Sequence, residues 1–231
     1  MFYDGIRGGW EENPVLLVQT NQLNTLKMGG FQPLTALDLG CGLGFGSKNL
    51  KGVFPEVRVV GVDITDSVKE DFQINSASDF IHIDGVTLPF GNDFFDVVLV
   101  NDVIEHVADT DSLIKEISRV LAPNGTLLLS TPNMAAWFNR MSLLFGYQLF
   151  FSEVSYEKIF GRPGSDVVGH LRLFTQSALV QFLAYHGFNV SNLSAAPFAA
   201  LPKRLHFIDR FFCKKTSLAA CLCVTATKAK A

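Results

Sequence analysis

The chain has 231 residues, of which 48% are hydrophobic and 18% are charged, and its formal net charge is −3. A chain of this length can bury the core of one sizeable domain, and its composition excludes an intrinsically disordered protein. No apolar run reaches the roughly 18 residues that a membrane-spanning helix needs. The negative net charge also argues against a protein whose main partner is nucleic acid.

Charge is distributed unevenly along the chain. From Lys203 onward there are seven basic residues and a single acid, Asp209, so this tail carries +6 and the remainder carries −9. Phe207, Phe211 and Phe212 are interleaved with these cations, a pattern that fits an anionic substrate or a lipid headgroup surface. The alternative is a solvated edge of a packed terminal hairpin. The sequence therefore leaves a peripheral contact with a membrane surface open.

The cysteines and the N-terminal residues bear on the compartment. Cys41, Cys213, Cys221 and Cys223 have neither the spacing of a disulfide framework nor that of a zinc finger. The first residues contain no basic segment followed by an apolar run, which a secretory signal would have. We therefore expect reduced thiols and a cytoplasmic protein. The oligomeric state is not indicated by any pattern.

Strand and helix patterns alternate along the chain, which predicts an α/β fold with a mostly parallel sheet and helices on both faces. Helix boundaries are indicated by Pro14, by Gly29 with Gly30, and by Thr175 and Gly187. In chain order we expect a helix over residues 14–28, a strand over 35–40, a helix over 46–54, strands over 57–64, 79–84 and 95–101, a helix over 109–121, a strand over 126–132, a helix over 175–188, and strands near 188–194 and 218–227. No linker or repeat interrupts the pattern, so residues 1–231 are expected to form a single domain.

Residues 133–174 form a long insertion between the fifth strand and the last helix. Its first part has apolar side chains at helical spacing, and "GRPGSDVVGH" at 161–170 has the composition of a loop. An insertion at this point of an open α/β sheet lies over the carboxyl ends of the strands, where such sheets bind ligands. We interpret it as a lid over an acceptor site; the alternative is an extra core helix on the sheet edge. The apolar residues at helical spacing are Met134, Trp137, Phe138, Met141, Leu144 and Phe145.

The stretch "LDLGCGLGFGSKNL" at 37–50 is a strand followed by a glycine-rich turn, as in several nucleotide sites. A phosphate-binding loop would require Gly-Lys-Ser/Thr, and here the order is Gly46, Ser47, Lys48. A dinucleotide fingerprint would require a third glycine where this chain has Phe45. What remains is an acid, Asp38, two residues before a G-x-G-x-G turn.

Four further blocks follow this turn in order: "VVGVDIT", "HIDGVTLPFGNDFFDVVLVNDVIEHV", "ISRVLAPNGTLLLSTPN" and "GHLRLFTQSALVQFLAYHGF". Together they resemble the class I S-adenosylmethionine-dependent methyltransferases, in particular the small-molecule group of type 11 and ubiquinone-pathway O-methyltransferases. The resemblance covers roughly residues 34–190. It implies a Rossmann-like, doubly wound, seven-stranded sheet whose last strand is antiparallel.

The resemblance also implies S-adenosylmethionine as the cofactor, bound at the carboxyl ends of the strands. Asp63 would accept hydrogen bonds from both ribose hydroxyls, and Asp84 would accept from the adenine amine. Asn101 would lie under the methionine moiety, whereas Asp38 has the alternative role of ordering the loop through backbone amides. Cys41 is expected as a small buried filler and not as a nucleophile. The expected cofactor-binding residues are Asp38, Gly40, Cys41, Gly42, Gly44, Asp63, Ile64, Asp84, Gly85 and Asn101.

The stretch "NDVIEHV" supplies the candidate catalytic group, His106, because a histidine that ordinarily titrates near pH ~6.5 can accept a proton at neutral pH. Two other interpretations stay open. Asp102 and Glu105 have the spacing of a capping box. Alternatively, the order D-x-x-E-H resembles the E-x-x-E-H with which some methyltransferases hold a divalent metal, and His170 stands where one such group has another ligand. Asp102 departs from that pattern by one methylene, and we expect no metal.

We therefore expect an S-adenosylmethionine-dependent methyltransferase that acts on a small or lipid-like acceptor at oxygen. The alternatives are an RNA or protein methyltransferase and a cofactor-binding regulatory protein without turnover. DNA is not an expected substrate, because Val-Asn-Asp-Val at 100–103 lacks the proline-aromatic signature of amino-methylating DNA enzymes.

Overall fold

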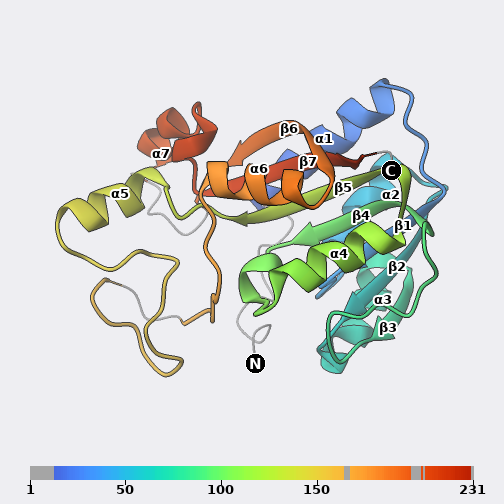
Figure 1. Cartoon of the computed structure of the whole chain (residues 1–231), viewed down its shortest axis with the longest axis horizontal. Helices are drawn as coiled ribbons and strands as arrows, with labels where there is room; N and C mark the ends of the chain where they lie inside the picture. Colours follow the sequence, from blue (N-terminus) through green and yellow to red (C-terminus); the bar gives the residue numbers. More distant parts are fainter. Residues whose placement is uncertain (1–12, 164–166, 199–203, 205, 230–231) are drawn as a thin grey trace.

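The computed structural model describes residues 13–163, 167–198, 204 and 206–229. Helices cover both faces of a central sheet, and a long irregular segment extends beyond one edge (Figure 1). The strands are β1 (Thr35–Leu39), β2 (Arg58–Asp63), β3 (Asp79–His82), β4 (Phe95–Asn101), β5 (Leu121–Pro132), β6 (Phe188–Ala196) and β7 (Cys221–Lys228). The α-helices are α1 (Pro14–Met28), α2 (Phe45–Val53), α3 (Lys69–Ser76), α4 (Thr110–Val120), α5 (Trp137–Leu144), α6 (Gln176–Tyr185) and α7 (His206–Phe212).

The sheet has seven strands in the order β3-β2-β1-β4-β5-β7-β6, and only β7 runs antiparallel to its neighbours. The chain crosses from one side of β1 to the other between β3 and β4, so the topological switch point lies between the carboxyl ends of β1 and β4. The predicted fold class, including the antiparallel last strand, is confirmed.

Alternating side chains of the strands place one core on each face of the sheet. Leu37 of β1 packs in the cluster that includes α4 and α6, whereas the adjacent Ala36 packs in the cluster that includes Leu23 of α1 and Leu50 of α2. This alternation is the period-two pattern of an extended strand. Both faces of the sheet are buried, as expected for parallel strands joined by helices.

Caps and turns explain several boundaries. Asn13 caps α1 by accepting a hydrogen bond from the Val15 amide at 2.9 Å, and Pro14 occupies the first turn. Thr175 caps α6 in the same way through the Ala178 amide. Three features were not predicted: helix α3, helix α7, and an early start of β5, which pairs Leu121 with Phe95 and then shifts register.

The insertion 133–174 contains α5, whose side chains are buried at its start and exposed at its end. Its first turn is packed: Phe138 is 6% exposed and lies in a cluster with Ala136, Phe151 and Ala220. Its last turn is open, with Leu144 73% exposed. The start of the helix is thus packed in a core cluster and its end is exposed, and the role of the insertion as a lid stays a prediction. No helix in the described part of the chain is long and apolar enough to cross a membrane.

Candidate functional site

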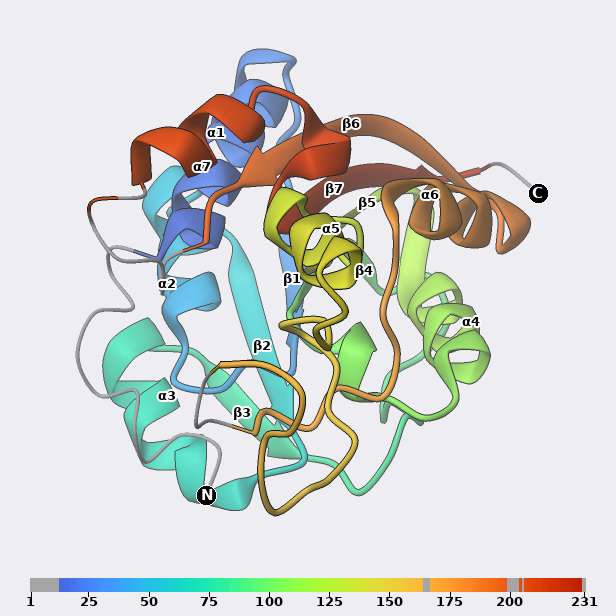
Figure 2. The same cartoon turned by 90° about the vertical axis from the view of Figure 1, so that its left-hand side faces the viewer.

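The carboxyl ends of β1, β2 and β4 meet at one edge of the sheet, and the insertion lies at the same edge (Figure 2). Parallel strands direct the residues that follow them to this edge, so the motifs after β1, β2 and β4 come together although they are far apart in sequence. The register confirms this neighbourhood, because Asp38 of β1 pairs laterally with Gly61 of β2 and Leu99 of β4.

The turn after β1 requires its glycines. Gly40, Gly42 and Gly44 have φ values of +68°, +46° and +84°, in the left-handed region that side chains disfavour. A Cβ at Gly40 would also lie 2.3 Å from the Cγ2 of Val103. The loop thus packs against Val103 at Gly40, whereas a Cβ at Gly44 would lie 3.0 Å from Phe72 of α3.

Asp38 lies beneath this loop. Its side chain is 2% exposed and accepts a hydrogen bond from Ser47 Oγ at 2.6 Å, at the start of α2. Burial raises the pKa of Asp38 to about 6, and the hydrogen bonds from the Ser47 side chain and backbone oppose this shift. The hydrogen bond between Asp38 and Ser47 therefore connects β1 to the start of α2. Cys41 is buried and burial raises the pKa of its thiol, which fits a filler and not a nucleophile.

Asp63, at the end of β2, holds the loop from the other side. One carboxylate oxygen accepts the Gly42 amide at 2.9 Å, and the other accepts the Thr65 amide at 2.8 Å. Asp63 thus holds the loop through both of its carboxylate oxygens. The next side chain, Ile64, is 69% exposed and forms an open apolar surface beside this acid.

Asp84 and Gly85, after β3, are exposed to solvent. A Cβ at Gly85 would have no neighbour within 4 Å, so the space beside this residue is open. This edge of the sheet thus presents an exposed apolar side chain after β2, Ile64, and a solvated acid after β3, Asp84. These groups could hold the adenosine part of S-adenosylmethionine, the cofactor that the sequence resemblance implies, and the neighbouring acids Asp38 and Asp63 would disfavour a phosphate.

Asn101 closes β4 and meets a residue that the sequence pattern did not indicate. Its amide nitrogen donates to Gln19 Oε1 at 3.1 Å, and its oxygen accepts from Gln19 Nε2. Gln19 lies on α1 and is 2% exposed. A Cβ at Gly46 would lie 3.0 Å from the Asn101 amide nitrogen and 3.1 Å from an Asp38 oxygen. Asn101 and Asp38 therefore converge at the start of α2, and α1 orients Asn101.

The chain after Asn101 adopts a rare conformation. Asp102 has a φ of +52°, and its carboxylate accepts a hydrogen bond from Ser130 Oγ of β5 at 2.8 Å. A 3-10 turn, η3 (Ile104–His106), follows Val103 and has no side-chain cap. The capping-box interpretation is therefore wrong: the short turn starts too late for Asp102 to cap it, and Glu105 turns toward β5.

Glu105 is a fully buried acid. One of its oxygens accepts from Thr131 Oγ1 at 3.0 Å, and the other has no hydrogen-bond partner among the described residues. Burial and the nearby Asp102 hold the pKa of Glu105 well above its usual range. Its backbone carbonyl accepts the amides of Leu171 and Arg172, at 2.7 and 3.0 Å. The end of the insertion is thereby fixed over η3.

Two imidazoles face each other at this junction. The rings of His106 and His170 lie 4.9 Å apart between centroids. Nδ1 of His106 lies 3.3 Å from the Gly169 carbonyl, and Nδ1 of His170 lies 3.0 Å from the Phe151 carbonyl. A carbonyl partner requires Nδ1–H in each ring, so Nε2 is the basic nitrogen of both neutral rings. Burial lowers the pKa of His170 to about 4, and the nearby His106 acts in the same direction.

Ligand-type atoms of Glu105, His106 and His170 all lie within 4.8 Å of one another. This trio has the donor set that could hold a divalent cation. Asp102 is not part of this trio, and its carboxylate accepts a hydrogen bond from Ser130 Oγ instead. The arrangement supports two chemistries: an oriented imidazole that accepts a proton, or a small metal site.

Comparison with known proteins finds similarity over part of the chain. Residues 37–129 match a family described as a methyltransferase domain. A malonyl-[acyl-carrier protein] O-methyltransferase of Legionella pneumophila is 32% identical over 103 residues, which are 43% of this chain and 36% of that protein. A demethylmenaquinone methyltransferase of Staphylococcus aureus is 28% identical over 172 residues, 66% of this chain and 70% of that protein.

A solved structure shares the fold over nearly the whole chain. The 1,6-didemethyltoxoflavin-N1-methyltransferase of Burkholderia thailandensis, with bound 1,6-didemethyltoxoflavin and S-adenosylhomocysteine, has a TM-score of 0.62 at 17% identity and covers 99% of this chain and 84% of its own. Against the Legionella relative, by contrast, this chain spans only about a third of the length. Residues 37–129 are thus similar to a methyltransferase domain, and the fold of the described chain is that of solved S-adenosylmethionine-dependent methyltransferases.

Proposed function

We propose that this protein transfers the methyl group of S-adenosylmethionine to a small or lipid-like acceptor at an oxygen atom, with His106 as the general base. The observation that carries this proposal is the orientation of His106. Its Nδ1 is held by the carbonyl of Gly169 in the insertion, so the ring is positioned by the segment that would cover the acceptor. A base fixed in this way needs no reorganisation when the proton is transferred.

The cofactor-binding roles are part of the proposal. Asp63 and Asp84 would bind the ribose and the adenine, Ile64 would contact the ring, and Asn101 would lie beside the methionine part. When bound, S-adenosylmethionine supplies an electrophilic methyl group. The protein then has three tasks: to align the acceptor, to exclude water, and to hold the acceptor's proton on Nε2 of His106.

The acceptor class is supported by the insertion and by the relatives. Phe150 and Phe151 pack in the aromatic cluster around Phe138, and the Phe151 ring lies 6.2 Å from the His170 ring, so the insertion next to His170 is apolar. The names of the Legionella and Staphylococcus relatives specify malonyl-[acyl-carrier protein] and demethylmenaquinone as acceptors. An apolar cover suits an acceptor with an acyl or prenyl chain better than a polar nucleotide.

The test is a transfer assay with methyl-labelled S-adenosylmethionine and three acceptor sets, two that offer an oxygen and one that offers a nitrogen: long-chain dicarboxylic acids and their monothioesters, alkylated hydroquinones, and alkylamines. We expect label on an oxygen-bearing set, with a rate that rises as the ring becomes neutral. Label only on amines would overturn the oxygen assignment. Bound cofactor that stays intact with all three sets would favour a protein without turnover.

A further inference from the structure

Helix α7 is anchored to the molecule by one of its faces. Asp209 is 1% exposed and accepts hydrogen bonds from Trp137 Nε1 and from the Phe198 amide, both at 2.8 Å. Phe212, one turn further, stacks on Trp137 with 5.1 Å between ring centroids. The only acid of this helix is therefore used internally, to attach α7 to α5.

The opposite face of α7 is apolar and basic. Phe207 and Phe211, four residues apart, are 71% and 65% exposed. Arg210 and Lys214, also four residues apart, are exposed beside them, and Lys214 Nζ lies 5.9 Å from the centre of the Phe211 ring. Residues four apart share one side of a helix. Phe207 and Phe211 therefore share one side of α7, and Lys214, which follows the end of the helix, lies beside the Phe211 ring.

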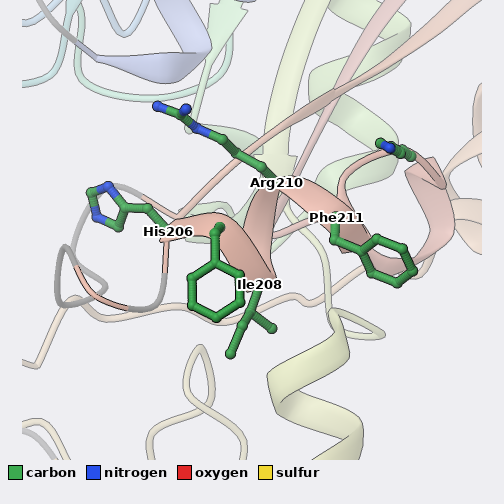
Figure 3. A pocket seen from close by; sticks show the side chains of 6 residues that line it. His206, Ile208, Arg210 and Phe211 are labelled. Carbon is green, nitrogen blue, oxygen red and sulfur yellow. The ribbon is translucent and has the colours of Figure 1, made fainter.

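The side chains of His206, Ile208, Arg210 and Phe211 extend from α7 in several directions around a hollow (Figure 3). This open hollow has a volume of about 880 Å³ and shares no residue with the glycine loop. Its lining consists of His206, Phe207, Ile208, Arg210, Phe211 and Lys214. It is a surface feature of α7 and not part of the cofactor site.

The carboxyl-terminal end of α5 is a second exposed apolar segment on the same side of the molecule as α7 (Figure 1). Leu143, Leu144 and Phe145 are 58%, 73% and 68% exposed. Figure 1 shows α5 and α7 together at the edge to which β4 and β5 point, and Figure 2 looks onto that edge. We call the outer face of α7 and the carboxyl-terminal end of α5 the α5–α7 surface. It is unusually apolar for an exposed region, since isolated exposed apolar residues are normal but a cluster is not.

Charge identifies the kind of partner. Among the described residues from 204 to 218 the only acid is the buried Asp209, whereas Arg204, Arg210, Lys214 and Lys215 are exposed. The whole chain nevertheless has a net charge of −3. Cations are thus concentrated on the α5–α7 surface, next to large apolar rings. Protein-binding surfaces are depleted in lysine, whereas interfacial membrane helices combine lysine or arginine with phenylalanine and leucine.

We propose that the α5–α7 surface docks on an anionic lipid bilayer, with Phe207, Phe211 and the end of α5 inserted among the lipids and Arg210 and Lys214 at the headgroups. In this orientation the edge that carries the cofactor site and the insertion faces the membrane. Docking on a bilayer requires no methyl transfer, so this proposal can be confirmed or contradicted independently of the proposed function.

The experiment is sedimentation of the full chain with vesicles of phosphatidylglycerol and phosphatidylcholine in equal parts. We expect binding that weakens as salt is raised, because charges are screened. Arg210→Gln with Lys214→Gln should lower the partition coefficient about 25-fold, since each cation near an anionic surface contributes about fivefold. Phe207→Ser with Phe211→Ser should lower the partition coefficient about tenfold or more, because two exposed rings would no longer insert among the lipids.

A matched control removes apolar area and charge elsewhere on the surface. Tyr185→Ser with Ile74→Ser replaces side chains that are 83% and 72% exposed, and Lys69→Gln with Lys115→Gln removes two exposed cations. Both control variants should bind vesicles like the unchanged protein, and thermal melts should show that all four variants fold. Absence of sedimentation, or equal losses in the α7 and control variants, would overturn the proposal. Binding to polyglutamate without binding to vesicles would assign the surface to an acidic protein instead, and would overturn it as well.

Discussion

The two halves of the candidate site are built in different ways. On the cofactor side, Gly40 and Gly42 allow a tight turn, and Asp63, 21 positions after Gly42, accepts a hydrogen bond from the Gly42 amide. On the acceptor side, Glu105 and His106 come into contact with residues of the insertion more than 60 positions away. The first half is organised by backbone geometry, and the second by buried side chains from distant segments.

This difference has a chemical consequence. The conformation of the glycines does not change with pH, whereas the acceptor side holds three titratable groups, Glu105, His106 and His170, within 4.8 Å of one another. These neighbouring groups could exchange a proton during a reaction, whereas Asp38 on the cofactor side is buried and hydrogen-bonded to Ser47. Substitutions in the two halves should affect different measurements.

The largest effect is expected from His106→Ala. Loss of a general base should lower kcat about 10²–10⁴-fold, while cofactor affinity by titration calorimetry stays unchanged. His186→Ala is the matched control, because His186 contacts Asp111 and lies outside the site. Full activity of His106→Ala across neutral pH, on the true acceptor, would contradict the assignment.

Chelation separates the base from a metal site. If the trio held a divalent cation, chelator would reproduce the loss, and Glu105→Ala, His106→Ala and His170→Ala would each lose the ion. We expect chelator to leave the rate unchanged. Metal content measured on the purified protein then checks the same point without an activity assay.

The next effect concerns α5 and separates its anchor from its open end. Phe138 is 6% exposed among three other phenylalanine rings, so Phe138→Ala should lower the free energy of unfolding by about 3–5 kcal/mol. Phe145 is 68% exposed, so Phe145→Ala should change it by about 0.5 kcal/mol or less and should lower turnover if this end covers the acceptor. Denaturant melts measure the free energy of unfolding of both variants, and the transfer assay measures the turnover of Phe145→Ala. A large destabilisation by Phe145→Ala would make the whole of α5 a core helix.

The cofactor side could be predicted from the sequence because its determinants are local. The turn after β1 and the acid after β2 are each contained in a few consecutive residues, and the parallel topology brings strand ends together. The same logic predicted Asn101 at the end of β4. It did not reveal Gln19, because a glutamine on a helix carries no pattern that indicates a buried partner 82 positions away.

The acceptor side could be predicted only in part. The pairing of His106 with His170 was anticipated as one alternative, but the separation of Asp102 from that group depends on its left-handed conformation and on Ser130. Helix α7 was missed because its seven residues are too few to establish a period, and its anchor is one buried hydrogen-bonded acid, Asp209. Such contacts arise from tertiary packing and not from local propensity.

A pH titration of stability should show the two halves with opposite signs. Asp38 has a pKa raised to about 6, so the folded state binds more protons than the unfolded state between its ordinary value and pH 6. Its contribution to stability therefore falls as pH rises through that window. His170 has a pKa lowered to about 4, so the unfolded state binds more protons between pH 4 and its ordinary value. Its contribution therefore rises with pH.

Single substitutions should reveal these opposing slopes. Relative to the unchanged protein, Asp38→Asn should gain stability with rising pH between about 4 and 6, and His170→Gln should lose it, each by about 2–3 kcal/mol across the window. Taking differences from the unchanged protein removes the contributions of other groups. Urea melts at half-unit pH steps provide the measurement. Parallel curves for both variants would show that neither group titrates differently in the folded state.

The smallest expected effect compares two acids of the cofactor side. Asp63 is 3% exposed, and its carboxylate is already held by the Gly42 and Thr65 amides, so it is preorganised for further donors. Asp63→Ala should weaken S-adenosylmethionine binding by about 1–3 kcal/mol, because it leaves hydroxyls and loop amides unpaired. Asp84 is exposed, and water can replace it, so Asp84→Ala should cost only about 0.5–1 kcal/mol. Asp63→Asn, which keeps one acceptor oxygen, should fall between them in titration calorimetry. Equal affinity of Asp63→Ala and the unchanged protein would limit Asp63 to holding the loop and would move ribose recognition to another residue.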